Sequence, residues 1–156
     1  MPQLYHDILL PIDVDDEGSS ASAVLTAMDL ARQFGARLHA MTAVPDVGVS
    51  MGAPFSSANA NKRLIEHARE RLEAVLREKV PSGLVVEQTV ALGSVYREIL
   101  RVAQELPADL IVMGSHRPER ADFLLGSNAA KVVRHAKCSV LVVRHDFAVS
   151  PWAVLP

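Results

Sequence analysis

The residues best placed to bind an anion follow a continuously apolar run that ends at Gly114. A polar segment leads from there to the sequence Leu-Leu-Gly-Ser-Asn-Ala-Ala, in which Gly126, Ser127 and Asn128 precede a short amphipathic stretch, residues 129–136. We expect Ser127 or Asn128 to cap a helix there and to leave backbone N–H groups free in its first turn. Together with the helix dipole and with Gly114 and Gly126, which have no Cβ to obstruct an anion, these groups would form a phosphate-binding site.

A carboxylate stands at the end of a second apolar run. Residues 7–12 are typical of a buried strand, and Pro11 fits only near its end because proline supplies no ladder N–H. Asp13 follows at once, where it can accept hydrogen bonds from a ribose hydroxyl or an adenine amine. Alternatively, it starts a turn with Asp15 and Asp16. The acidic connection would repel phosphate, so a ligand's anionic end should point away from it.

The polar loop after Gly114 also contains the residues on which a catalytic hypothesis depends. His116 and Asp122 are its plausible proton acceptors, and Arg117 and Arg120 could stabilise negative charge. A histidine beside a glycine turn is more often a loop-stabilising hydrogen bonder, so we assign no catalytic residue. Arg117 either neutralises phosphates or points to water. The lysine of a Walker motif is missing, which excludes a P-loop kinase or motor mechanism.

Composition favours one domain, residues 1–144, followed by a tail, residues 145–156. The chain has 156 residues, of which 49% are hydrophobic and 22% charged. Its net charge of −2 gives no case for binding nucleic acid or an anionic membrane. The apolar runs are too short for a membrane span and the N-terminus does not resemble an export signal, so the cytoplasm is the expected location.

Cysteine and histidine usage predicts no metal or redox site. The six histidines are scattered without metal-ligand spacing. The lone Cys138 excludes an internal disulfide, and its place before an apolar run predicts a packed thiol.

The remaining pattern alternates helices with strands. Leu25, Met28 and Ala31 are expected on the core face of the first helix, and residues 46–61 form either a lid over the ligand or a disordered connection. Because parallel neighbours need crossover helices, the pattern predicts a single α/β doubly wound five-stranded parallel sheet with helices on both faces. The expected helices are 62–80, 95–106, 129–136 and one from Ser20 or Ser22 to residue 34; the expected strands are 7–12, 38–44, 84–92, 110–113 and 140–144.

The combination of Leu-Leu-Pro-Ile-Asp near the start with Ser-His-Arg-Pro and Leu-Leu-Gly-Ser-Asn-Ala resembles the universal stress protein family from Asp7 to Arg144. In that family a glycine, two residues, a second glycine, a spacer of about nine and Gly-Ser cradle the phosphates of ATP. Gly114 and Gly126 with Ser127 match here. Arg117 replaces the second glycine and eight residues, 118–125, follow it, so the chain resembles a short-spacer branch.

The resemblance implies strand order 3-2-1-4-5, which makes Asp13 and Gly114 flank one crevice. It also implies ATP, with or without Mg²⁺, as the ligand, and a stress-response module that regulates another protein. A slow ATP-hydrolysing enzyme and a nucleotide-free dimeric scaffold are the alternatives. The expected site residues are Pro11, Ile12, Asp13, Ala43, Met113, Gly114, His116, Arg117, Gly126, Ser127 and Asn128.

The last apolar run predicts how the chain assembles. The strand from Val140 to Arg144 would lie at a sheet edge without a proline or an inward charge to protect it. Antiparallel pairing with the same strand of a second copy would cover it, and the resemblance also implies such homodimers. The tail, with Phe147 and Trp152, could cover the edge instead and keep the chain monomeric.

Overall fold

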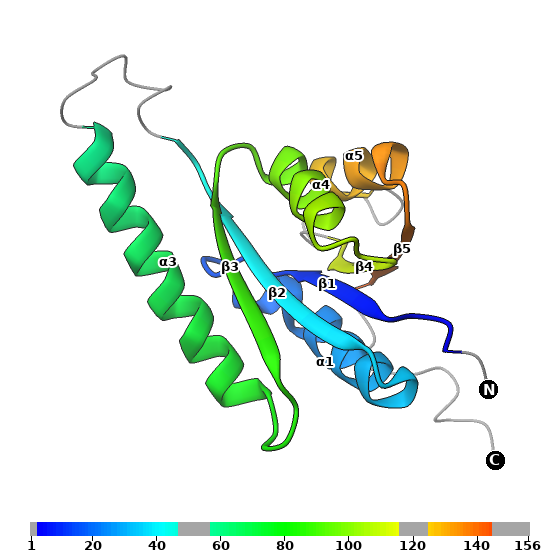
Figure 1. Cartoon of the computed structure of the whole chain (residues 1–156). Coiled ribbons are helices and arrows are strands. Elements are labelled where there is room, and N and C mark those ends of the chain that lie inside the picture. The colour runs from blue at the N-terminus through cyan, green and yellow to red at the C-terminus, as the bar shows by residue number, and fades with distance from the viewer. Residues whose placement is uncertain (1–2, 47–56, 116–124, 145–156) are drawn as a thin grey trace.

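The computed structural model describes residues 3–46, 57–115 and 125–144, which form a five-stranded sheet and four helices. Every strand pair is parallel and the order is β3-β2-β1-β4-β5, which confirms the predicted fold class and order (Figure 1). In chain order the elements are β1 (Asp7–Pro11), α1 (Glu17–Phe34), β2 (Arg37–Val44), α3 (Ser57–Lys79), β3 (Val86–Leu92), α4 (Val95–Glu105), β4 (Leu110–Gly114), α5 (Ser127–His135) and β5 (Ser139–Val143).

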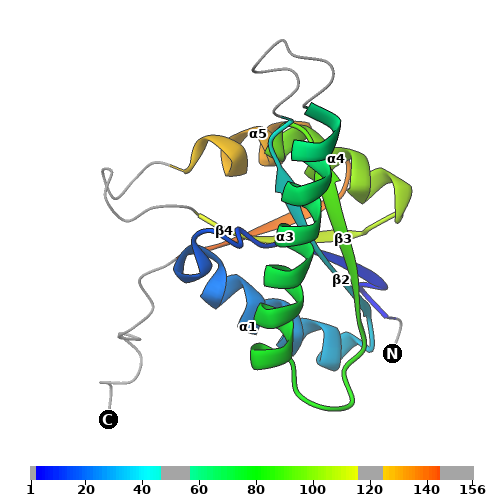
Figure 2. The ribbon, with the colours of Figure 1, turned by 90° about the vertical axis from the view of Figure 1, so that its left-hand side faces the viewer.

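The sheet is buried between two helical layers. Helices α1 and α3 cover one face, and α4 and α5 cover the other (Figures 1 and 2). Successive side chains of a strand point to opposite faces, so Ile8 and Leu10 pack with the α1 and α3 core while Leu9 packs with α4 and α5. All three are fully buried. Burial on both sides is why this strand reads as an unbroken apolar run.

Helix α1 begins earlier than predicted, at Glu17 instead of Ser20 or Ser22. The carboxylate of Asp13 is the reason, because its Oδ1 accepts hydrogen bonds from the backbone N–H groups of Asp15 and Asp16 at 3.0 and 3.2 Å. The turn formed in this way feeds directly into the helix. Both serines therefore lie inside the helix instead of capping it.

The core face of α1 also differs from the predicted one. Leu25 is 56% exposed, so its assignment to the core face was wrong. Val24 and Ala27, with Met28 and Ala31, are buried against the sheet. Gly35 ends the helix, as predicted, in a left-handed conformation with φ of 62°.

Helix α3 starts at Ser57, so the predicted irregular stretch 46–61 is shorter than expected. Its residues 47–56 lie outside the described part of the chain, and the lid hypothesis stays untested. Ala68, Leu72 and Leu76 are buried and form the core stripe of this helix. Within the described ranges, none of the helices is long and apolar enough to span a membrane.

A buried carboxylate joins β1 to β2 at the other end of the sheet from Asp13. Asp7 is 5% exposed, and it accepts hydrogen bonds from Arg37 Nη2 at 2.8 Å while its Oδ1 lies 2.7 Å from Arg37 Nε and 3.1 Å from His39 Nε2. Burial acts to raise the pKa of Asp7, but the hydrogen bonds from Arg37 and His39, helped by their charges, bring that pKa below its ordinary value.

Candidate functional site

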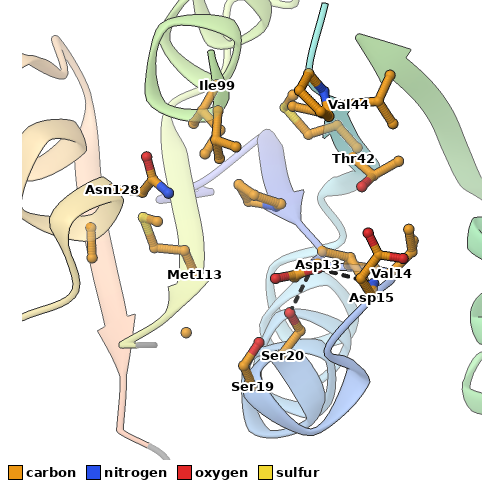
Figure 3. Close-up of a pocket in the computed structure, with 18 residues that line it drawn as sticks. Asp13, Val14, Asp15, Ser19, Ser20, Thr42, Val44, Ile99, Met113 and Asn128 are labelled. Atoms are coloured by element: carbon orange, nitrogen blue, oxygen red, sulfur yellow. Dashed lines mark hydrogen bonds between the residues drawn. The ribbon is translucent and has the colours of Figure 1, made fainter. Parts of the chain in front are cut away.

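A cavity of about 310 Å³ opens at the carboxyl ends of β1, β2 and β4, and Figure 3 shows its labelled side chains around one common space. The strands wind outward in opposite directions from β1 and β4, so the cavity lies at the switch point where doubly wound sheets bind ligands. It is lined by Pro11, Ile12, Asp13, Val14, Asp15, Ser19, Ser20, Met41, Thr42, Ala43, Val44, Pro45, Val95, Ile99, Met113, Gly114, Asn128 and Ala129.

The structure brings most of the predicted site residues to this cavity. Gly126 and Ser127 do not line it but directly precede Asn128, which does. His116 and Arg117 lie outside the described residues, so their roles stay predictions. The predicted residues that line the cavity are Pro11, Ile12, Asp13, Ala43, Met113, Gly114 and Asn128.

The backbone of Ala43 presents a donor and an acceptor to the cavity. The peptide groups of Met41 face β1, because its carbonyl accepts a hydrogen bond from the N–H of Ile12 at 2.8 Å. The peptide groups of Val44 face β3, because its carbonyl accepts a hydrogen bond from the N–H of Gly93 at 2.8 Å. Successive residues of a strand point their peptide groups to alternate sides, so the N–H and C=O of Ala43 face the β1 side. Strand β1 has ended at Pro11, and among the described residues no backbone hydrogen bond from that side reaches either group.

Apolar side chains form the wall beside this backbone edge. Ile99 of α4 is 1% exposed and Met41 of β2 is fully buried. Val95, one helical turn before Ile99, lies at the rim and is 39% exposed. A slot with apolar walls and a hydrogen-bonding backbone edge suits a flat heterocyclic ring.

Two carboxylates lie at the α1 end of the cavity, and that of Asp13 has no cationic partner among the described residues. The N–H of Asp13 donates to Ser20 Oγ at 3.1 Å, which holds Asp13 at the start of α1 (Figure 3). Its Oδ1 organises the turn, while no described residue hydrogen-bonds to its Oδ2. The turn role and a ligand role are therefore compatible. Asp15 is held at the rim by Arg71 of α3, with Nη1 2.8 Å from Oδ1.

The first turn of α5 offers backbone donors at another side of the cavity. The prediction that Ser127 or Asn128 caps this helix was wrong, since Gly126 is the N-cap and no side chain caps the helix. The first helical hydrogen bond runs from the N–H of Ala130 to the carbonyl of Gly126 at 2.9 Å. The N–H groups of Ser127, Asn128 and Ala129 therefore have no acceptor within the helix.

Several cavity residues were missed by sequence reasoning. Thr42 lies beside Ala43. Val95 and Ile99 have the i, i+4 spacing of one helical face, a signal that was readable because a helix was predicted to start at residue 95. Ser20 was considered only as a cap at the start of a helix, and Ser19 was not considered. Both are buried in the first turn of α1 because Asp13 begins that helix early.

Comparisons with known proteins give one consistent family. The model of the universal stress protein family matches residues 4–144. Universal stress protein G of Escherichia coli O157:H7 is 35% identical over 143 residues, which cover 90% of this chain and all of that protein. The solved structure of universal stress protein UspA from Lactobacillus plantarum superposes with a TM-score of 0.63 at 27% identity, covering 90% of this chain and 98% of that one. A universal stress protein solved in complex with cAMP gives a TM-score of 0.59 at 26% identity, covering 91% and 98%.

Proposed function

The chain belongs to the universal stress protein family, and we propose that it is a regulatory module that binds ATP in the cavity at the carboxyl edge of its sheet. Membership supports a role in the stress response. The relative solved with cAMP shows that a protein of this fold holds an adenine nucleotide. ATP is our proposal for this chain.

One observation carries the proposal: three kinds of polar group that a nucleotide needs converge on a single cavity. The Ala43 backbone supplies a donor and an acceptor for the edge of adenine, between the apolar walls of β2 and α4. The free carboxylate oxygen of Asp13 suits a ribose hydroxyl. The open N–H groups at the start of α5 suit phosphate, aided by the helix dipole.

The electrostatics fix the direction in which the nucleotide lies. Asp13 repels an anion at the α1 end, where the charge of Asp15 is compensated by Arg71, whereas the N-terminus of α5 attracts an anion. The nucleoside therefore lies toward α1 and β2, and the phosphates lie over Gly114 and the residues from Gly126 to Asn128. Mg²⁺, if bound, would accompany the phosphates.

Binding is favoured over hydrolysis by the side chains that face the cavity. Asp13 and Asp15 are the only titratable groups among its described lining. Asp13 already accepts two backbone hydrogen bonds and Asp15 is paired with Arg71, so neither is placed as a dedicated base for water. Slow hydrolysis is the second candidate because His116 follows Gly114, which lines the cavity, by two residues in the sequence.

We also propose that two copies pair through the last strand. Strand β5 spans Ser139–Val143, one residue displaced from the predicted Val140 to Arg144, and it lies at the edge of the sheet. Leu141 is 38% exposed there. Antiparallel pairing about a twofold axis would bury this leucine and satisfy an edge that no other described strand covers.

Nucleotide release from purified protein tests the function. Denatured protein should release an adenine nucleotide, identified by mass, in near-stoichiometric amount. Protein that carries none and binds no added ATP would contradict the proposal. Bound ATP should stay intact over hours with Mg²⁺, and its steady conversion to ADP would establish the enzyme instead.

A further inference from the structure

Helices α4 and α5, which lie side by side on one face of the sheet, enclose a second cavity of about 230 Å³ (Figure 1). Leu100 and Ala103 of α4 and Ile111 of β4 form apolar walls, and Ile111 is fully buried. This cavity is smaller than the sites of about 300–1,000 Å³ that hold drug-sized ligands. The cavity is called the α4–α5 pocket below, and its size and walls suit a single apolar side chain of a partner.

Two cations gather on one aromatic ring of the same helix pair. Lys131 Nζ lies 4.8 Å from the centroid of the Tyr96 ring, and the guanidinium carbon of Arg97 lies 5.7 Å from it. Arg97 Nε also donates a hydrogen bond to the Tyr96 hydroxyl oxygen at 3.0 Å. Tyr96, Arg97 and Lys131 are called the Tyr96 cluster below. Tyrosine and arginine are enriched among the residues that carry most of the binding energy in protein interfaces, so the cluster has the composition of a contact surface.

The Tyr96 cluster and the α4–α5 pocket lie next to each other. Leu100, which lines the pocket, follows Tyr96 by four residues on α4. His135, which also lines the pocket, follows Lys131 by four residues on α5. Residues four apart lie on the same face of a helix, about 6 Å apart along its axis. On both helices the pocket is therefore one helical turn from the cluster.

The positive charge of the Tyr96 cluster is not compensated by the described residues. Within the described ranges, no carboxylate forms an ion pair with Arg97 or Lys131. The acidic residues of α4, Glu98 and Glu105, both pair with Arg101, each at 2.7 Å. Arg97 also lies in the first turn of α4, where the helix dipole disfavours a cation. An anionic partner would offset both of these unfavourable terms.

The pocket itself is not left negative by the acidic residue beside it. The charge of Asp109 adds to burial in raising the pKa of the Cys138 thiol, which lines the pocket. The Asp109 carboxylate accepts hydrogen bonds from the backbone N–H groups of His6 and Asp7 at 2.8 and 3.1 Å. Lys137 also lines the pocket, and no carboxylate of the described residues pairs with it.

We propose that the Tyr96 cluster and the α4–α5 pocket together bind an acidic segment of a partner protein, with one apolar side chain in the pocket and carboxylates on Arg97 and Lys131. This inference names the class of partner for the regulatory module, and it rests on the proposed function only for the role of the contact. Charge complementarity and a site for an apolar anchor carry it. A nucleic-acid strand would meet the same cations but would leave the pocket empty, and the net charge of −2 gives it no wider attraction.

Fluorescence anisotropy with short labelled peptides tests this surface. The acidic probe is Glu-Glu-Leu-Glu-Glu, and its counterparts carry serine in place of leucine or lysine in place of glutamate. The leucine peptide should bind at least about tenfold more tightly than the serine peptide, because the pocket buries the leucine side chain. The lysine peptide should not bind. A thymidine pentanucleotide with the same number of charges tests the nucleic-acid alternative.

Charge removal and pocket filling locate the bound peptide. The double variant Arg97→Gln/Lys131→Gln should weaken the leucine peptide about tenfold, and less at high salt. Lys62→Gln/Arg63→Gln is the matched control, because it removes an exposed lysine and an exposed arginine from α3, on the other face of the sheet. Ala136→Leu adds a larger side chain to the pocket lining, so it should weaken the leucine peptide and leave the serine peptide unchanged.

Any of five results would overturn the proposal: wild-type protein that binds no acidic peptide, equal affinities for the leucine and serine peptides, equal losses in the double variant and the α3 control, unchanged binding of the leucine peptide by Ala136→Leu, or tighter binding of the pentanucleotide than of the leucine peptide. ATP binding by the same protein is measured separately. Protein that binds ATP but not the peptide overturns the surface alone, and protein that binds the peptide but not ATP overturns the proposed nucleotide site alone. Thermal unfolding of each variant confirms that it is folded.

Discussion

The α-carbon of Gly114 at the end of β4 packs directly against the backbone carbonyl of Ser19 in α1. A Cβ built on Gly114 would overlap that oxygen. The φ angle of Gly114 is not in the left-handed region, so the glycine is needed for space and not for backbone freedom. Sequence reasoning interpreted Gly114 as a phosphate-approach residue. The structure adds that the closure of α1 onto β4 needs it too.

Gly114→Ala should therefore destabilise the fold, by about 1 to 3 kcal/mol, because backbone cannot move aside as a flexible side chain would. Chemical denaturation measures the free energy of unfolding. Gly18→Ala is the control, since its new Cβ would meet only Asp16 Oδ1 at an ordinary 3.7 Å. Equal stability of the two variants would contradict the steric account.

The strands could be predicted because their signal is local, whereas their order was implied only by the resemblance to the family. Leu110 to Gly114 is an apolar run ending in glycine, and it is observed as β4 with the same start. The start of α1 could not be predicted in the same way. Ser20 and Ser22 are good cap residues, but the side chain of Asp13 forms a turn that lets the helix begin at Glu17, and tertiary burial then holds Ser20 inside it.

The site was partly predictable for a related reason. Asp13 and Gly114 each end an apolar run, so parallel topology brings them to one edge of the sheet. Contacts between segments that are distant in the sequence produce no local sequence pattern from which they could be predicted. The bond from Arg37 to Asp7 joins residues 30 apart in sequence, and Tyr96 meets Lys131 only because α4 packs on α5.

Asp7 should make the free energy of unfolding depend on pH in the acidic range. Its folded-state pKa is below the ordinary value of 3.8, so its stabilisation is complete above that pH and is lost as the pH falls through the folded-state pKa. Arg37→Gln removes the principal charged partner. The variant should be less stable at neutral pH, and the difference from wild type should shrink below about pH 4. Urea denaturation of both proteins across this pH range measures the difference in their free energies of unfolding. A difference that is constant with pH would rule out this linkage.

Gly126→Val should abolish ATP binding while the fold persists. Gly126 has φ of −54° and ψ of 153°, angles that valine adopts, so the backbone tolerates the change. The added branches would occupy the space that the phosphate needs beside the first turn of α5. Gly126→Ala is the matched control, since alanine is an equally poor N-cap without the branches. Equal affinity of the two variants for ATP would count against this position as part of the site.

Leu141→Lys should convert a homodimer into a monomer. A lysine at this exposed position of β5 would put like charges together across a twofold interface. Leu25→Lys is the control, because Leu25 is an exposed leucine of α1, outside that strand. Sedimentation at micromolar concentration gives the mass. A wild-type chain that sediments as a monomer, or a Leu141→Lys variant that stays dimeric, would exclude pairing through β5.

The most direct test of ATP binding in the cavity is to fill the slot beside Ala43. Val95→Trp places a large ring at the cavity rim, where the native side chain is 39% exposed, so the core is not disturbed. Val133→Trp makes the same change on α5, at a 46% exposed position outside the cavity lining. Titration calorimetry should show ATP binding to wild type and to Val133→Trp, and none to Val95→Trp at unchanged thermal stability. ATP binding by Val95→Trp with wild-type affinity would contradict the account.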